Sequence, residues 1–427
     1  MKKILTFLVI PLIVILFSNC SNNDNDLMDT LPPEEIEVSP NVKVYNPELL
    51  ENSLVFGIKN GGTNAFLINK IGDTLHDWNF DTKLGNDLEL LPNGKLIGIF
   101  KSENPDFSFG GYGGIIRILN PDDTIEWEYE YASETYIAHH DVELLPNGNV
   151  LFLAWEKVSS TAAQEAGVNT EKDIYPEVLI EVDAVSKEIV WEWHSFDHII
   201  QESFPQLPNY GVIKDNPDLI NINYNEVTNG DIMHANGIDY DPLKNVIYVS
   251  VNFYSEVWVI DHSTSTVEAS TNIGGTYDKG GRLLYRFGNP ETYNGLGERL
   301  FYNNHFPNLI EDNKPGTSNI LIYMNGFNTE QSIVYELDMP DSFSLQSGID
   351  NEPKVVWQYT HPDLYYDKIS GAVRLKNGNT LICEGDFGFW EVTPNKEIAW
   401  KYEGNQGNTF WRCYSYELNS SAITSLE

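Results

Sequence analysis

The repetition of one short pattern is the feature of this sequence that most constrains its fold. An apolar strand, an Asn-Gly pair and a second apolar strand recur as LELLPNGKLIGIF from Leu88, VELLPNGNVLFLAW from Val142 and AVRLKNGNTLICEG from Ala372. Asn-Gly between apolar runs predicts a β-hairpin, because both turn residues accept positive φ. Degenerate copies of the pattern begin at Asn236 and Phe306.

A third strand and then an aromatic strand follow each hairpin. The aromatic strands read IEWEYEY from Ile125, IVWEWHS from Ile189, LLYRFGN from Leu283, VVWQYTH from Val355 and IAWKYEG from Ile398, and an earlier copy ends at LHDWNF from Leu75. Six such units can bury their faces only by packing radially. The sequence therefore predicts an all-β fold, a six-bladed β-propeller with four-stranded antiparallel blades whose first strands line a channel. The strand TFWRCYSYEL, residues 409–418, lacks a following hairpin and is expected to close the ring by completing the first blade.

The composition fits this fold and restricts the partners. The 427 residues include 32 Gly, 23 Tyr, 20 Phe and 10 Trp, and no long stretch has helical spacing of apolar residues. The chain carries 63 acidic and 26 basic residues, for a formal net charge of -37. A field of that sign repels phosphates and anionic lipid headgroups, so we expect no nucleic-acid partner and no direct binding to a membrane surface.

The N-terminus resembles a bacterial lipoprotein signal peptide. Two lysines and an apolar run precede Cys20 in MKKILTFLVIPLIVILFSNC, and the resemblance implies acylation of that cysteine. We therefore expect a signal peptide over residues 1–20, a flexible acidic tether over 21–44 and the propeller over 45–427. The expected location is the bacterial cell envelope, on the outer membrane and either periplasmic or surface-exposed, with membrane attachment only through the lipid. An ordinary cleaved secretory signal and an uncleaved anchor are the alternatives.

The cysteines and the metal-ligand types set further limits. With Cys20 assigned to lipid, Cys383 and Cys413 remain, and the sequence leaves open whether they pair. No CxxC pair or Cys/His cluster has the spacing of a zinc site, which argues against structural zinc.

Histidines converge on one end of the predicted channel. When the units are aligned on their hairpins, His139 and His140, His234 and His305 fall at the channel ends of the first strands of three consecutive units. Converging imidazoles suit either a metal site or the transfer of an anionic group. Asp141 is the available carboxylate for a metal, but strand alternation points it away from His140. The other five histidines are expected on outer strands or loops.

Three stretches resemble the bacterial aryl-sulfate sulfotransferases. They are HHD before VELLPNGN, DIMHANGIDYDPLKNVIYVSVNFYSEVWVIDHSTS from Asp231, and DKGGRLLYRFGNPETYNGLGERLFYNNHFPNLI from Asp278. The resemblance runs from about residue 80 onward. Members of that family have a six-bladed propeller and need no 3′-phosphoadenylyl sulfate. The resemblance implies ping-pong transfer of a sulfuryl group from a phenolic sulfate to an acceptor phenol through a sulfohistidine, without cofactor or metal.

The resemblance also implies roles for individual residues. His305 matches the nucleophile, and His234 and His140, or alternatively His139, match the assisting histidines. Asn236 matches the asparagine of an H-x-N motif of the family. The predicted substrate contacts are His139, Asn236 and Asn252. Asn252 stands where the family often has an arginine, and it offers a neutral amide in place of a bidentate cation.

Four arginines are candidates to replace the missing cation, each with a structural role as the alternative: Arg282, Arg286, Arg374 and Arg412. Two other functions stay open beside sulfuryl transfer. One is a non-catalytic cell-surface propeller that binds sulfated or phenolic ligands, and the other is a metal-dependent lyase or hydrolase.

Overall fold

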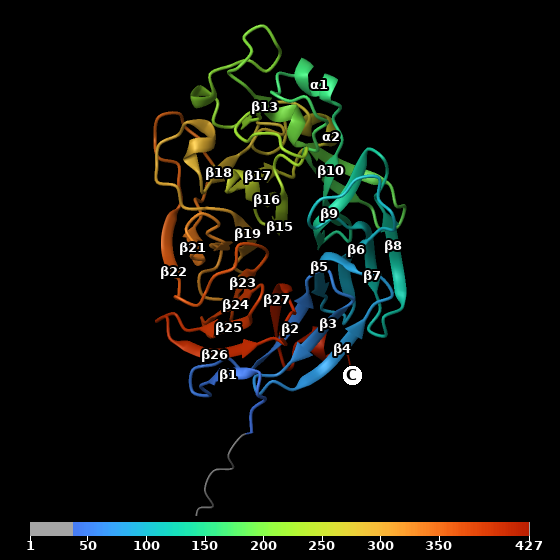
Figure 1. The fold of residues 1–427 in the computed structure, drawn as a ribbon, viewed down its shortest axis with the longest axis vertical. Coiled ribbons are helices and arrows are strands. Elements are labelled where there is room, and N and C mark those ends of the chain that lie inside the picture. The colour runs from blue at the N-terminus through green and yellow to red at the C-terminus, as the bar shows by residue number, and fades with distance from the viewer. Residues whose placement is uncertain (1–36, 427) are drawn as a thin grey trace, which may run out of the picture. The chain divides into compact units, whose positions relative to one another are not determined.

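Antiparallel β-sheets surround a common centre in the computed structural model, which describes residues 37–426 (Figure 1). Three sheets have four strands each. From the inside outward they are β27 (Phe410–Glu417), β2 (Ser53–Lys59), β3 (Asn64–Ile68) and β4 (Thr74–Asn79); β15 (Ala235–Asp241), β16 (Val246–Val251), β17 (Glu256–Asp261) and β18 (Tyr285–Phe287); and β19 (Asn304–Leu309), β20 (Ile320–Met324), β21 (Ile333–Asp338) and β22 (Lys354–Tyr359).

Two larger sheets complete the arrangement. An eight-stranded sheet joins β5 (Leu84–Leu90), β6 (Leu96–Lys101), β7 (Gly114–Leu119) and β8 (Ile125–Glu130) to β9 (Tyr136–Leu144), β10 (Val150–Glu156), β11 (Glu177–Val182) and β12 (Ile189–His194). A five-stranded sheet contains β23 (Gly371–Arg374), β24 (Thr380–Glu384), β25 (Gly388–Val392), β26 (Ile398–Glu403) and β1 (Val42–Tyr45).

The remaining elements are short and lie in the connections. They are the helices α1 (Ser160–Glu165), α2 (Thr266–Ala269) and α3 (Ser421–Thr424), the 3-10 turns η1 (Ser195–His198), η2 (Ile213–Asp215), η3 (Asn252–Tyr254) and η4 (Pro290–Tyr293), and the paired strands β13 (Ile199–Ile200) and β14 (Ile220–Asn221).

The inner strands form a closed ring. Strand β27 contacts β5, and the contacts continue through β9, β15, β19 and β23 back to β27. The predicted closing strand is confirmed, because β27 pairs antiparallel with β2 near the beginning of the chain. The ring thus brings the first strands of successive hairpin units together at the centre (Figure 1).

The all-β, propeller-like arrangement with four-stranded antiparallel blades is confirmed, but the prediction of six separate blades is not what the strand pairing gives. The backbone of His140 in β9 pairs with Asn86 in β5, and this single parallel pairing fuses two meanders into the eight-stranded sheet. Strand β1 extends another sheet by pairing with β26. Since β1 covers Val42–Tyr45, the tether predicted over 21–44 overlaps a folded strand and must end earlier.

Burial follows the position of each strand in its sheet. Central strands such as β10 and β16 are almost wholly buried and consist mainly of Val, Ile, Leu and aromatic residues. The outer strands β4 and β8 leave alternate residues exposed, as expected of a sheet face in contact with water. The apolar residues of neighbouring sheets pack against each other between the blades, and this packing holds the inner strands in place.

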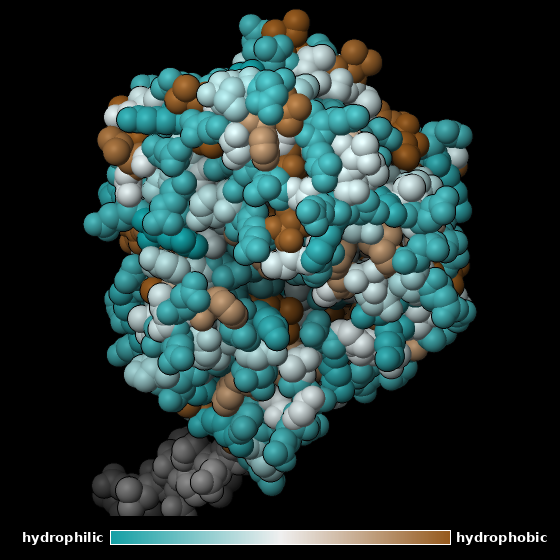
Figure 2. Space-filling model, turned by 45° about the horizontal axis from the view of Figure 1, so that its top comes forward, coloured by the Kyte–Doolittle hydropathy of each residue, from teal (hydrophilic) through white to brown (hydrophobic). Residues whose placement is uncertain are grey.

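The surface is mostly hydrophilic. Figure 2 shows apolar residues scattered among polar ones on a face that is hollowed near its middle. Over residues 37–426, no helix has the length and apolar character needed to cross a bilayer.

Candidate active site

Regular strand pairing breaks at one level of the inner ring. The register shifts between Leu84 and Leu88 in β5, between His139 and Val142 in β9, between Ala235 and Gly237 in β15, and between His305 and Asn308 in β19. Bulges of this kind redirect side chains and occur frequently beside active sites. The histidines that the sequence places at the channel end, which are His139 and His140, His234 and His305, all lie at or next to these interruptions.

Backbone strain accompanies the bulges. His140 has φ 57°, His234 has φ 53° and Phe306 has φ 55°, all in the left-handed region. A non-glycine residue held there costs on the order of 1–2 kcal/mol. The surrounding structure therefore sustains three strained residues at one level of the ring, which is typical of a functional site.

The strained strands bring the predicted histidines together. The rings of His140 and His234 lie 4.8 Å apart between centroids. The Trp411 indole of β27 lies 5.7 Å from the His140 ring and 5.9 Å from the His305 ring. His140, His234 and His305 thus occupy one site.

A glycine-rich loop between β6 and β7 borders this site. The backbone N–H of His140 donates to the carbonyl oxygen of Gly111, at 3.0 Å. Gly111 has φ 81°, and a Cβ atom built on it would overlap the His140 ring. Only glycine satisfies both the conformation and the close approach at this position.

His305 is held in one tautomer by Asn325. Its Nδ1 lies 2.6 Å from Oδ1 of Asn325, while the Asn325 amide donates to the carbonyl oxygens of Tyr366 and Ile369. Those two bonds fix Oδ1 as the acceptor, so Nδ1 of His305 donates and Nε2 keeps its lone pair. Burial lowers the pKa of His305 to about 3. The ring is therefore neutral, with Nε2 available as a nucleophile.

His234 has the opposite electrostatic setting. Its Nδ1 lies 2.5 Å from a carboxylate oxygen of the buried Asp231. Burial by itself lowers the pKa of His234, but the charge and hydrogen bond of Asp231 outweigh it and raise the pKa above its ordinary value. The Phe253 ring stacks on the imidazole at 4.8 Å. His234 is therefore the histidine of this cluster that most readily carries a proton.

His139, which we predicted to contact substrate, points away from the cluster of His140, His234 and His305. Its ring is fully buried and stacks on Trp155 at 3.7 Å. Nε2 lies 2.9 Å from Oε2 of Glu177, and Nδ1 lies 2.8 Å from Nδ1 of His140. The bulge at His140, whose φ is positive, breaks the regular alternation of the strand, so the His140 ring reaches the site while the His139 ring contacts the next strands outward.

The side chains of Asn236 and Asn252 brace the strand that carries His305. Both amides donate to the carbonyl oxygen of Asn304, at 2.8 and 3.2 Å. The side-chain oxygen of Asn252 accepts a hydrogen bond from Asn303. The donors that we predicted for substrate are thus already bonded to the backbone beside His305.

Carboxylates pair with all four candidate arginines. Arg286 pairs with Glu256, Arg374 with Glu336, and Arg282 with Asp218. Arg412 lies beneath the histidines, where it donates to both oxygens of Asp141 at 2.9 and 2.8 Å and to Asp87 at 3.2 Å. Each of the four arginines therefore has a structural role as an ion-pair partner. Asp141 is the ion-pair partner of Arg412, not a metal ligand.

A cavity of about 320 Å³ adjoins the cluster. Asp231 and Phe253, which both contact His234, line it together with Asn303 and Phe327. Phe253 and Phe327 are 40% and 56% exposed, so apolar ring surface is accessible there. Within residues 37–426, no three His, Cys, Asp or Glu side chains are arranged to hold a metal ion.

The remaining predicted positions lie outside this cluster. His194 and His262 pair with Glu156 and Glu181, and Nε2 of His198 in η1 donates to the carbonyl oxygen of Ala269 in α2. His76 lies on the outer strand β4 and His361 after β22. Cys383 and Cys413 are free and buried, and Cys20 lies outside the described residues.

Sequence reasoning missed four residues that orient the histidines: Asp231, Glu177, Asn325 and Trp411. Asp231 precedes His234 by three positions in DIMHAN, a spacing that a search for acid–histidine pairs could have found. Glu177 and Asn325 are far in sequence from the histidines that they contact, and only the fold brings them close.

Comparisons with known proteins identify the family of the chain. A search of curated proteins finds no match. Among solved structures, dihydro-heme d1 dehydrogenase NirN in complex with DHE aligns with a TM-score of 0.37 and 10% identity, over 94% of this chain and 79% of that chain. The family model for arylsulfotransferase (ASST) matches residues 46–413, which is most of the chain. The chain therefore belongs to the arylsulfotransferase family.

Proposed function

We propose that this protein transfers a sulfuryl group from a phenolic sulfate ester to an acceptor phenol by a ping-pong route through His305. Family membership supports aryl sulfotransferase activity in general. The observation that carries the mechanism is the pair of opposite settings within one cluster, a neutral His305 with a free Nε2 and a His234 biased toward its protonated form. A nucleophile and an acid are what cleavage of an aryl sulfate requires.

The first half-reaction forms a bond between Nε2 of His305 and sulfur and breaks the bond between sulfur and the aryl oxygen. The electron pair of the broken bond goes to the aryl oxygen, and the Nε2 proton of His234 neutralises it. Asp231 stabilises the imidazolium before that transfer. Asn325 keeps its hydrogen bond to Nδ1 of His305 while Nε2 carries the sulfuryl group.

The second half-reaction reverses these bond changes with a new phenol. Its oxygen loses a proton to a base in the site, attacks sulfur and displaces His305. The cavity lined by Phe253 and Phe327 lies beside His234 and suits an aromatic ring. Its volume of about 320 Å³ is at the small end of ligand pockets, so we propose phenols of one or two rings as substrates.

One observation favours the alternative of a cell-surface protein that binds sulfated ligands without turnover. Arg412, the cation nearest the histidines, is neutralised by Asp87 and Asp141. The predicted arginine position holds Asn252, whose amide bonds Asn304. Without a free cation the site stabilises the charge that develops during sulfuryl transfer less well, which favours binding without turnover.

Turnover of a chromogenic aryl sulfate tests both functions. With an acceptor phenol, the enzyme should release the chromophore continuously, whereas a binding protein should only retain the ester. Without acceptor, one equivalent should be released in a burst, and a peptide containing His305 should gain the mass of one sulfuryl group. A label on His140 or His234 contradicts the assigned roles, and binding without any release favours the alternative.

The location is a separate part of the proposal. We infer from the signal-like segment that Cys20 is acylated and anchors the protein in the bacterial cell envelope, with the donor and acceptor as its only other partners. Cys20→Ala should then move the protein from the membrane fraction to the soluble fraction with its turnover intact. Persistent membrane association contradicts the anchor.

A further inference from the structure

We propose that Glu177, His139 and His140 form a proton relay in which Nε2 of His140 is the base that deprotonates the acceptor phenol. The inference rests on the proposed function and assigns the base that its second half-reaction needs. It gives Glu177 and His139, neither of which reaches the substrate site, the role of positioning residues.

Hydrogen bonds fix the orientation of the Glu177 carboxylate. Its Oε1 accepts from the backbone N–H of Ala235 at 2.7 Å and from the indole N–H of Trp155 at 3.2 Å. Its Oε2 is left for Nε2 of His139, at 2.9 Å. Glu177 and His139 are 1% and 0% exposed, so water does not compete for this contact.

We place Glu177 in its ionised form in the resting relay, and this charge state together with the orientation determines the tautomers of both histidines. With Glu177 ionised, His139 donates from Nε2 and must accept at Nδ1. Nδ1 of His140 lies 2.8 Å from that Nδ1, so His140 donates from its own Nδ1. Nε2 of His140 then carries a lone pair, and this atom lies against Gly111 of the loop that borders the site.

The same contacts can move a proton without building up charge on either imidazole. The phenol proton goes to Nε2 of His140, the Nδ1 proton of His140 goes to Nδ1 of His139, and the Nε2 proton of His139 goes to Oε2 of Glu177. Meanwhile the phenol oxygen bonds to sulfur and the bond between sulfur and His305 breaks. One negative charge leaves Glu177 and ends on the new sulfate ester. Return of the proton from Glu177 through His139 and His140 to His234, whose ring lies 4.8 Å from that of His140 between centroids, restores both groups for the next turnover.

Burial favours this route over formation of an imidazolium. Desolvation lowers the pKa values of His139 and His140 well below the ordinary value, and it raises the pKa of Glu177 well above. A proton that enters the relay is therefore best held by the carboxyl group. The charged and titratable groups that face the relay from neighbouring elements are Asp231 and His234 before β15, Asp141 in β9, His305 in β19 and Arg412 in β27.

A second buried glutamate accepts from the same two kinds of donor, a backbone N–H and an indole, but contacts no histidine. Glu384 accepts from the backbone N–H of Tyr365 at 3.0 Å and from the indole of Trp390 at 2.7 Å. Burial raises its pKa to about 7. Glu384 is therefore a matched control, because its replacement by Gln changes the same type of buried carboxyl group away from the site.

The decisive variant is Glu177→Gln, which keeps the size of the side chain and reverses the relay. An amide N–H directed at His139 forces the other tautomer, in which Nε2 of His140 is protonated. We expect the burst of chromophore from the donor to stay within about threefold of wild type. Turnover with acceptor should fall about 10²-fold or more, because loss of a general base typically costs 10²- to 10⁴-fold. Glu384→Gln should match wild type in both.

A spectroscopic readout separates this proposal from the proposed function. Nitrogen-15 NMR of the resting protein, assigned with His140→Gln, should show an unprotonated Nε2 of His140 in wild type and a protonated one in Glu177→Gln. Equal tautomers in the two proteins, or equal loss of burst and turnover in Glu177→Gln, overturns the relay. Absence of a burst in wild type contradicts the sulfohistidine route. The relay is then tested by the tautomers alone.

Discussion

The two ends of the inner ring differ in both backbone regularity and charge. At one end, bulged strands with left-handed residues hold His140, His234 and His305. At the other end, the same strands pair regularly and carry Glu89 in β5 and Glu143 in β9, and β15 carries Asp239. The bulges of β9, β15 and β19 thus lie at the end where the imidazoles gather, and the strands pair regularly at the carboxylate end.

The two ends also differ in how their charges are balanced. Each histidine has a fixed hydrogen-bond partner, whereas the carboxylates of the other end act mainly on one another. Burial and mutual repulsion raise the pKa of Glu89 to about 7 and that of Asp239 to about 8. Arg412 with Asp141 and Asp87 lies between the two ends. An anionic substrate therefore meets the imidazole of His234, whose protonated form Asp231 stabilises, at one end and buried acidic groups at the other.

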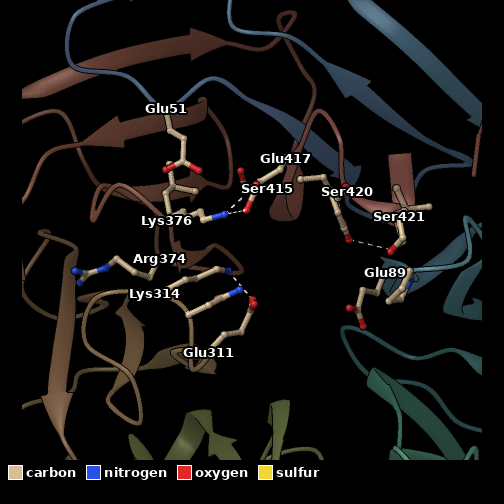
Figure 3. A pocket seen from close by; sticks show the side chains of 16 residues that line it. Glu51, Glu89, Glu311, Lys314, Arg374, Lys376, Ser415, Glu417, Ser420 and Ser421 are labelled. Atoms are coloured by element: carbon tan, nitrogen blue, oxygen red, sulfur yellow. Dashed lines mark hydrogen bonds and ion pairs between the residues drawn. The ribbon is translucent and has the colours of Figure 1, made fainter. Parts of the chain in front are cut away.

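A second cavity marks the carboxylate end. Figure 3 shows Glu89 across from Lys314 and Glu311, which pair with each other, and Lys376 paired with Glu417. The cavity has a volume of about 350 Å³ and is similar in size to the one beside His234. Size alone does not distinguish the two ends, so the assignment of the active site depends on the side chains and their partners.

The largest effect expected is from His305→Ala. Without the nucleophile the ping-pong route has no covalent intermediate, so we expect no burst and a loss of turnover of at least about 10³-fold. Stopped-flow measurement of chromophore release tests this. His361→Ala, on a side chain that is one-third exposed after β22, is the control and should retain full activity. Substantial turnover by His305→Ala would move the nucleophile to another histidine.

Removal of the cation between the two ends should affect stability more than any surface change. Arg412→Met leaves Asp141 and Asp87 buried without their partner, and breaking such a pair typically costs about 3–5 kcal/mol. Lys43→Met breaks the exposed pair with Glu403 and should cost less than about 1 kcal/mol. Denaturant unfolding measures both free energies. Equal costs for the two variants would mean that Arg412 does not separate the ends as described.

Asp231→Asn should weaken the acid at the histidine end. The neutral amide no longer holds a proton on His234, so its pKa should fall. The wild-type donor half-reaction requires protonated His234 and slows as the pH rises through that raised pKa; in the variant this decline should move to lower pH. At neutral pH the burst rate should drop about 10²-fold, most strongly for donors with a basic leaving phenol.

The exposed pair of His361 and Asp363 supplies the control for that experiment. Their atoms lie 3.7 Å apart, and Asp363→Asn should leave the pH profile of the burst unchanged. A profile of Asp231→Asn that also coincides with wild type would show that His234 does not protonate the leaving group.

Most of the fold could be predicted from the sequence, because hairpin signals are local. Asn-Gly pairs and aromatic strands act over a few residues, so they placed the meanders and the closing strand β27. The fusion of two meanders depends on the bulge at His140, which no local pattern encodes. Strand β1 was missed because its four residues follow a polar, proline-bearing stretch and pair with β26, more than 350 positions away.

Part of the site could also be predicted, because the histidines lie at fixed places relative to the local hairpin signals. Alignment of the hairpins located His140, His234 and His305, but the role of each depends on a partner that the chain brings from elsewhere. Strand alternation also gave no means of deciding whether His139 or His140 faces the site, because the bulge changes the phase between them. Long-range contacts, such as that of Glu177 with His139, become visible only in the folded structure.

The smallest effect expected lies at the carboxylate end, where Glu89→Gln should raise stability without changing activity. The pKa of Glu89 is about 7 in the folded protein, above the value of about 4.3 for an unfolded chain. Between these values the folded state binds more protons than the unfolded state, so this group makes stability fall as the pH rises. The glutamine variant has no carboxyl group at this position and so does not lose stability in this way as the pH rises.

The melting temperature of Glu89→Gln should exceed that of wild type by roughly 1–3 °C at pH 8 and match it near pH 4.5, where both side chains are mainly neutral. Differential scanning calorimetry at the two pH values measures the difference, and the burst assay checks that the histidine end is unaffected. A burst that changes as much in Glu89→Gln as in Asp231→Asn would mean that the two ends act as one electrostatic unit, and the division drawn between them would then be wrong.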